Sequence, residues 1–168
     1  SLWNTVAEES NTAVKADDGN VFLSINKAPY VSGKYFPENT VQTVKFVPKT
    51  ASAGSKVNLI FAANSALEFD NNTKELKNDH FRLEIENGLA DLYERELGEE
   101  RLVKKGIEFP LKDNEENHIK IACMPARDKT IVTIWLNGEV KANVLAEREA
   151  ISGYIGFSTI KTGIKVIE

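Results

Sequence analysis

Apolar and polar residues alternate along most of this chain, which is the pattern of β-strands that bury one face. The clearest example is the run 131–136, which is rich in β-branched and aromatic residues and ends in Asn137-Gly138. This dipeptide is typical of a two-residue hairpin turn. A second apolar run, 140–145, follows the turn, so we predict a β-hairpin here.

The two faces of the 131–136 strand differ in chemistry. One face is entirely aliphatic and suits a core, with Val132, Ile134 and Leu136. The other face carries a hydroxyl and an indole, with Ile131, Thr133 and Trp135. An indole on the less apolar face is either covered by another element or serves as a flat platform for a ligand. Both interpretations of Trp135 stay open.

Short alternating runs bounded by turn residues recur along the rest of the chain, at 21–25, 30–36, 41–47, 57–61, 81–86, 89–95, 97–105, 119–124, 151–160 and 164–167. Helical periodicity is scarce, although 142–150 contains helix formers and is either a turn of helix or a loop. Repeated short strands predict one all-β domain over residues 1–168, built as a two-sheet antiparallel β-sandwich. The abrupt start and the apolar end lead us to expect a domain excised from a larger secreted protein.

Composition and charge limit the classes of partner expected for this domain. The chain has 168 residues and a net charge of −4, with both signs interspersed. We therefore expect neither a nucleic-acid nor a membrane surface, and no apolar run has the length of a membrane-spanning helix. The single cysteine, Cys123, excludes an intrachain disulfide and a Cys-rich zinc site. It alternates with Ile119 and Ile121, which predicts a buried, inert thiol.

Three segments resemble the concanavalin A-like lectin and laminin-G type jelly roll. They are the hairpin start 81–88, the strands 119–121 and 132–138 with their apolar-aromatic-apolar-Asn-Gly ending, and the segment 152–157, Ser-Gly-Tyr-Ile-Gly-Phe. The nearest similarity is to bacterial carbohydrate-binding modules of this fold, including the fructan-binding type. The first 50 residues resemble this family only in the spacing of their predicted strands.

The resemblance implies a jelly roll that acts as a non-catalytic carbohydrate-binding module. Such a module would hold an appended glycoside hydrolase or polysaccharide lyase at its polysaccharide or oligosaccharide substrate, in a secreted or cell-surface protein. Because one fold hosts many functions, two alternatives stay open. One is an adhesion or structural module of a cell-surface protein, and the other is a glycoside hydrolase or lyase domain.

Catalytic residues are not expected. Glucanases of this fold place carboxylates two positions apart on one strand, so that they share a face. Glu68 and Asp70 have this spacing, but an Asn-Asn turn separates them from Glu75. Glu84 and Glu86 also share a face, but Arg82 and His80 share it with them, which favours a neutralised polar row.

No cofactor or metal ligand is expected either. Two acidic turns, 70–72 and 113–115, resemble calcium loops only in composition, because neither has the glycine and distal glutamate of an EF-hand. Structural calcium is nevertheless common in this fold family. His80 and His118 are isolated in the sequence, so ordinary strand or surface positions are favoured over metal ligation.

Sugar recognition combines an aromatic ring on the apolar face of the sugar with charged groups that bind its hydroxyls. Alternation places Arg82 and Glu84 on one face of their strand, and Tyr93 and Arg95 on one face of its hairpin partner. If these strands share a sheet with Thr133 and Trp135, the groups form a single binding surface, which Tyr154 would join. The alternative is a solvated face with cross-strand ion pairs.

Overall fold

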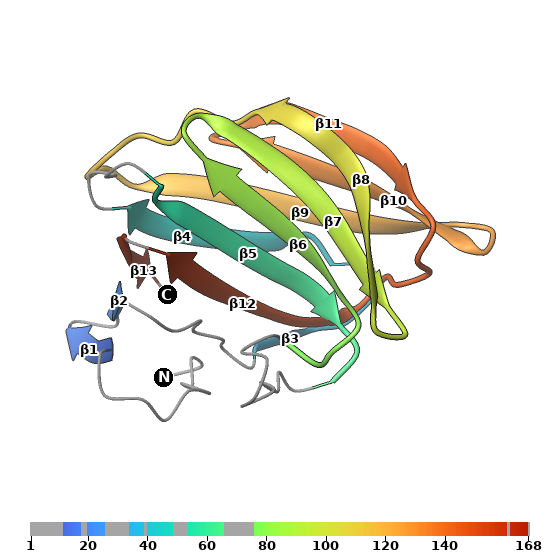
Figure 1. Ribbon diagram of the computed structural model, residues 1–168, viewed down its shortest axis with the longest axis horizontal. Coiled ribbons are helices and arrows are strands. Elements are labelled where there is room, and N and C mark those ends of the chain that lie inside the picture. Colours follow the sequence, from blue (N-terminus) through green and yellow to red (C-terminus); the bar gives the residue numbers. More distant parts are fainter. Residues whose placement is uncertain are drawn as a thin grey trace.

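The computed structural model of the protein describes residues 12–17, 20–25, 34–38, 40–48, 54–65, 76–160 and 162–167. Within these ranges all regular elements are β-strands, and they pair antiparallel in two sheets. The sheets stack as two layers, with the six-stranded sheet in front of the seven-stranded sheet in Figure 1. The predicted all-β, two-sheet sandwich is therefore confirmed.

The seven-stranded sheet has the order β1-β2-β13-β4-β9-β10-β11. Its edge strands are β1 and β11, and its last three strands form a continuous meander. Its strands are β1 (Thr12–Asp17), β2 (Asn20–Ile25), β4 (Gln42–Pro48), β9 (Asn117–Ala126), β10 (Lys129–Leu136), β11 (Glu139–Ala146) and β13 (Gly163–Ile167).

The six-stranded sheet has the order β3-β12-β5-β6-β7-β8. Strands β6, β7 and β8 again follow one another in sequence and in space. Its strands are β3 (Lys34–Phe36), β5 (Lys56–Ala63), β6 (His80–Glu86), β7 (Leu89–Glu96), β8 (Glu99–Glu108) and β12 (Gly153–Ile160).

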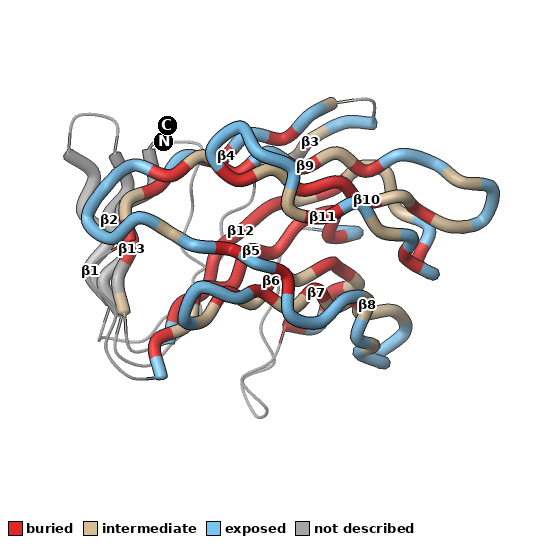
Figure 2. The backbone as a smooth tube through the Cα atoms, turned by 90° about the horizontal axis from the view of Figure 1, so that it is seen from above, coloured by how far each residue is buried: buried red, intermediate tan, exposed pale blue. Residues whose placement is uncertain are grey.

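The core lies between the two layers, where the buried positions of facing strands meet (Figure 2). Val132, Ile134 and Leu136 belong to this core, as their alternation predicts. Phenylalanines fill much of the remaining volume, and Phe46 of one sheet lies with its ring centroid 5.5 Å from that of Phe157 in the other. Burial of these side chains is the main stabilising contribution to the sandwich.

Two Asn-Gly turns close the hairpins that the sequence predicts. Asn87 and Asn137 have φ of 51° each, and the glycines that follow them also have positive φ. A two-residue turn of this type matches the twist of the strands it joins, and Asn and Gly adopt positive φ at low cost. The β7–β8 hairpin has the same geometry with Leu97 at φ 52°.

The structure also revises the sequence prediction. Residues 142–150 contain no helix, because β11 continues to Ala146 and the chain then bends toward β12. Ala142 and Ala146 face the core at strand spacing, and this pattern prevails over the helix-forming composition. Strand β1 was not predicted. Residues 30–33 of the predicted 30–36 strand lie outside the described residues.

The described residues contain no helix long and apolar enough to cross a membrane. Cys123 is buried, and burial raises the pKa of its thiol to about 12. A thiol with this pKa is almost entirely protonated near neutral pH and therefore a poor nucleophile. The prediction that this cysteine is buried is confirmed.

Candidate functional site

The outer face of the six-stranded sheet gathers most of the residues predicted for a binding surface. Arg82 of β6 lies directly opposite Tyr93 of β7, and Glu84 lies opposite Asp91. Their neighbours along each strand, such as Leu83 and Leu92, are buried in the core. Alternation therefore directs the polar side chains away from the sandwich interior, as expected from the sequence.

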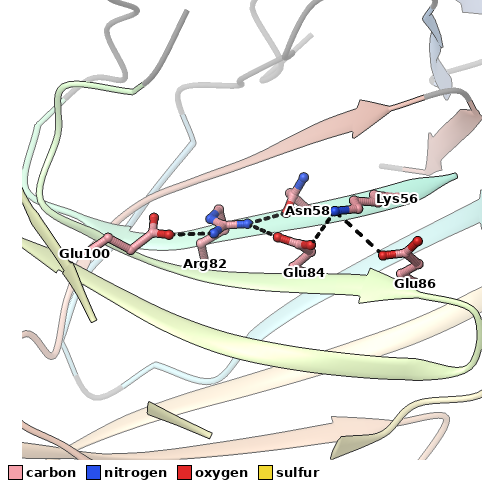
Figure 3. A network of polar contacts seen from close by, with 6 residues as sticks. All are labelled: Lys56, Asn58, Arg82, Glu84, Glu86 and Glu100. Carbon is pink, nitrogen blue, oxygen red and sulfur yellow. Dashed lines mark hydrogen bonds and ion pairs between the residues drawn. The ribbon is translucent and has the colours of Figure 1, made fainter. Parts of the chain in front are cut away.

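Five charged side chains form a continuous row on this face (Figure 3). Arg82 forms ion pairs with Glu84 and with Glu100, the latter with 2.8 Å between Nη2 and Oε1. Lys56 continues the row, with its Nζ 2.9 Å from Glu84 Oε1 and 3.6 Å from Glu86 Oε2. Anions and cations thus alternate from β8 across β6 to β5.

Arg82 is the centre of this charged row. Its Nη1 also donates a hydrogen bond to Asn58 Oδ1 at 2.9 Å, and Asn58 is itself a buried residue of β5. The guanidinium carbon lies 4.3 Å from the centroid of the Tyr93 ring, a cation–π contact. These contacts hold the planar guanidinium in one position, although the side chain retains 19% of its exposure.

The ion pairs also determine the protonation of the carboxylate beside Arg82. Burial would raise the pKa of Glu84, but hydrogen bonds from Arg82 and Lys56 outweigh that effect and lower it. The pKa of the Lys56 amine is raised, chiefly by its hydrogen bond to Glu84. Both groups are therefore charged near neutral pH.

Two other predicted site residues lie on the same sheet but outside this row. Arg95 is opposite His80 on one side and Glu100 on the other, near the end of the sheet where β6 begins. Tyr154 of β12 packs against a small second apolar cluster that includes Ile60 and Leu76. Tyr154 is therefore partly engaged in packing.

Thr133 and Trp135 do not join this surface. They lie on β10, which belongs to the seven-stranded sheet, so the sandwich separates them from Arg82 and Tyr93. The predicted single binding surface is therefore not formed, because β10 does not share a sheet with β6 and β7. Thr133 has only 9% exposure, while Trp135 is partly exposed between Lys120 of β9 and Val140 of β11.

Three residues of the charged row and its support were not predicted from the sequence: Lys56, Asn58 and Glu100. Lys56 and Asn58 alternate with the buried Val57 and Leu59, so their outward direction was available from the pattern. The pairing of β5 with β6 could not be read from the pattern, because a long connection separates the two strands. That connection includes 66–75, which lie outside the described residues. The position of Glu100 next to Arg82 depends on how β8 pairs with β7, and the sequence does not give that register.

Some of the residues considered for catalysis or metal binding lie within the described ranges and others do not. Glu68, Asp70 and Glu75, with the acidic turn 70–72, lie outside the described residues. Among the residues that are described, no three His, Cys, Asp or Glu side chains are grouped to hold a metal ion. His80 is buried, and its Nδ1 lies 2.7 Å from the carbonyl oxygen of Asn78. Burial lowers the pKa of His80 to about 4.

Comparison with solved structures places this sandwich among lectin-like folds. The carbohydrate-binding module CBM66 from Bacillus subtilis is similar with a TM-score of 0.59 and 14% identity, over 99% of this chain and 92% of that one. A Bacillus subtilis protein of unknown function with a galectin-like fold reaches a TM-score of 0.66 and 16% identity, over 94% and 84% of the two chains. The fold is therefore the concanavalin A-like, galectin-like jelly roll.

An enzyme shares the same architecture. A β-1,3-1,4-glucanase (lichenase) derived from a mouse hindgut metagenome is similar with a TM-score of 0.60 and 10% identity, over 98% of this chain and 90% of that one. No family model and no curated sequence matches this chain. At these identities the likeness establishes the fold and not the function, because one fold hosts many functions.

Proposed function

We propose that this protein is a non-catalytic carbohydrate-binding module whose saccharide site is the charged row on the outer face of the six-stranded sheet. The observation that carries the proposal is the fixed position of Arg82, which is bound by Glu84, Glu100 and Asn58 and stacked on Tyr93. A rigid array of charged groups beside an aromatic ring suits a ligand that offers many hydroxyl groups.

The chemistry of the row matches hydroxyl recognition. Each carboxylate has about four lone-pair positions, so Glu84, Glu86 and Glu100 keep acceptor capacity while they bind their cations. Charged groups form stronger hydrogen bonds with hydroxyls than neutral groups do. Because the side chains are already held by one another, little entropy is lost when a sugar binds.

The same arrangement argues against hydrolysis at this site. A general acid for glycoside hydrolysis needs a raised carboxyl pKa, so that it is protonated near neutral pH. The pKa of Glu84 is instead lowered by hydrogen bonds from Arg82 and Lys56, which outweigh the raising effect of burial. Glu84 therefore serves as a hydrogen-bond acceptor and not as a proton donor.

A shallow face of this kind supports weak binding to each sugar. Weak modules are useful when they are joined to a catalytic domain, because tethering raises the local concentration of substrate. We therefore propose that the module belongs to a secreted or cell-surface polypeptide that degrades polysaccharides, and that the module keeps the enzyme on its substrate.

Affinity electrophoresis in gels that contain a polysaccharide panel tests the binding function. We expect retarded migration of the wild type on at least one polysaccharide and its loss in Arg82→Ala. Arg127→Ala is the matched control, because Arg127 is exposed in the β9–β10 turn of the other sheet. It should migrate as the wild type does.

A second pair of variants locates the site. Tyr93→Ala should weaken retardation, whereas Trp135→Ala should leave it unchanged, because Trp135 lies on the opposite sheet. The melting temperature of each variant separates loss of binding from loss of folding. Retardation that survives Arg82→Ala but disappears in Trp135→Ala would move the site to the seven-stranded sheet.

One observation favours an adhesion module as the second candidate. The outer face of β9, β10 and β11 carries the exposed apolar residues Val140, opposite Trp135, and Met124 and Leu145, which lie opposite Ile131. Exposed apolar patches are common at protein interfaces. Absence of retardation on every polysaccharide would favour this function over sugar binding.

A further inference from the structure

A pocket of about 310 Å³ opens at the end of the sandwich, and its lining includes the residues on either side of Lys56 and of Glu86 in the sequence. It lies where the β6–β7 turn, the β8–β9 connection and the ends of β4 and β5 come together. Its lining comprises Pro48, Ser55, Val57, Ile85, Asn87, Gly88, Pro110, Leu111, Asp113 and Thr162. The volume is at the lower end of the range found for small-molecule sites.

The lining combines an apolar wall with a few polar groups, which is the usual composition of a ligand pocket. Val57 and Ile85 come from the inner faces of β5 and β6 and connect the pocket to the core. Asn87 and Thr162 supply an amide and a hydroxyl, and Asp113 is the charged residue among the described residues of the lining. The described part of the lining thus offers hydrogen bonds and a negative charge.

The β8–β9 connection that forms one wall is held by hydrogen bonds at both ends. The Phe109 N–H donates to Gly88 O, and the Asn114 N–H donates to Pro48 O, each at 2.8 Å. These two bonds join the connection to the β6–β7 turn and to the end of β4.

A buried asparagine holds the same connection from inside. Asn117, with 0% exposure, accepts a hydrogen bond from the Lys112 N–H and donates to the carbonyls of Lys112 and Glu115, at 2.9 to 3.0 Å. Its Oδ1 also accepts a bond from Asn137 Nδ2 at 3.2 Å. The wall is therefore formed before a ligand arrives, which lowers the cost of binding.

We propose that this pocket binds a single saccharide unit that carries no acidic group, as a second site separate from the charged row. The apolar wall suits the C–H face of a sugar ring, and the polar groups suit its hydroxyls. Because Asp113 is the charged residue of the lining, an amino sugar is favoured and a uronic acid is disfavoured. The choice of a saccharide rests on the proposed function, whereas the charge preference rests on the pocket alone.

Titration of the ¹⁵N-labelled protein with glucose, glucosamine and glucuronate at millimolar concentrations and slightly acidic pH tests the proposal. We expect amide shifts at Ser55, Asn87, Gly88 and Thr162. Glucosamine should bind more tightly than glucose, and glucose more tightly than glucuronate, each by about two- to fivefold, which is typical of partly exposed charge pairs.

Variants test the role of the carboxylate. Asp113→Asn should remove the preference for glucosamine over glucuronate, while Glu115→Gln should keep it. Glu115 is the matched control, because it is an exposed carboxylate of the same connection that does not line the pocket. Thr162→Phe should fill the pocket and abolish the shifts, with the melting temperature reporting on folding.

The outcomes separate this proposal from the sheet site. Shifts confined to Arg82, Glu84 and Tyr93 would overturn the pocket and leave the proposed function standing. Shifts confined to the pocket would support the pocket and contradict the sheet site. An unchanged order of the three sugars in Asp113→Asn, or no shift at the pocket with any sugar, would overturn the pocket.

Discussion

The carboxylate of Glu94 accepts a hydrogen bond from the backbone N–H of Arg148 at 2.8 Å, between residues 54 positions apart in sequence. Glu94 occupies an inward position of β7 and has 3% exposure. Its other oxygen lies 3.3 Å from Nε of Arg101 on β8. This contact joins the six-stranded sheet to the connection that follows β11, near the edge where β8 approaches β11.

Glu94→Ala should lower the free energy of unfolding by about 2 kcal/mol, because the buried N–H of Arg148 loses its acceptor and Arg101 loses one of its two carboxylate partners, keeping Glu96. Urea unfolding measures the change. Glu99→Ala, at an exposed carboxylate of the adjacent strand, is the control and should cost less than about 0.5 kcal/mol. Equal losses in the two variants would contradict a structural role for Glu94.

Leu97→Asn should stabilise the protein by about 0.5 to 1 kcal/mol. Leu97 has φ of 52° in the β7–β8 turn and is 91% exposed, so its side chain gains little from packing there. Asparagine adopts positive φ more readily than leucine. The backbone N–H of this residue would still donate to Asp79 Oδ1. A lower melting temperature in Leu97→Asn would show that leucine contributes a contact at this turn.

Stability should fall as the pH drops from about 6.5 to about 4. Burial lowers the pKa of His80 to about 4, whereas an unfolded histidine has a pKa of about 6.5. Between these values the unfolded state binds more protons, so protonation favours unfolding, by about 3 kcal/mol over the full interval.

Urea unfolding at a series of pH values measures this effect, and His80→Gln should flatten the dependence in that interval. The contribution of Glu84 behaves differently. Its lowered pKa means that its stabilising ion pairs are lost only as the pH falls below the ordinary carboxyl range. An equally steep decline in His80→Gln would assign the effect to other groups.

Cys123 should be unreactive toward a thiol reagent such as Ellman's reagent until the protein unfolds. Burial raises the pKa of its thiol from 9.0 to about 12, so the thiolate fraction at pH 8 falls about a thousandfold, and burial also blocks the reagent. The reaction rate in native buffer, compared with that in concentrated urea, measures the protection. Comparable rates would show that β9 opens readily.

The sequence predicted the inward and outward faces of the strands well. Val132, Ile134 and Leu136 face the core, and Arg82, Glu84 and Tyr93 face outward, as alternation requires. The two Asn-Gly turns were also predicted correctly, since the turn geometry depends on two adjacent residues. Both features are local, so a few neighbouring residues contain the information.

The grouping of those strands was decided by tertiary structure. The sequence predicts that β10 and β11 form a hairpin, and that β6 and β7 form another, but not that the hairpins belong to opposite sheets. Trp135 was therefore associated with Arg82, although the core lies between them. Likewise, the partners Lys56 and Glu100 reach Arg82 through strand pairings that depend on the sheet order.

By itself, then, the sequence determined an all-β sandwich, its hairpins, and the polar faces that could bind a ligand. The fold alone decided which polar residues meet, and it formed the pocket between Asn87 and Asp113, which lie on separate segments of the chain. The physical reason is that side-chain direction follows from the two-residue repeat of one strand. Contact between strands depends instead on how the whole chain buries its apolar faces.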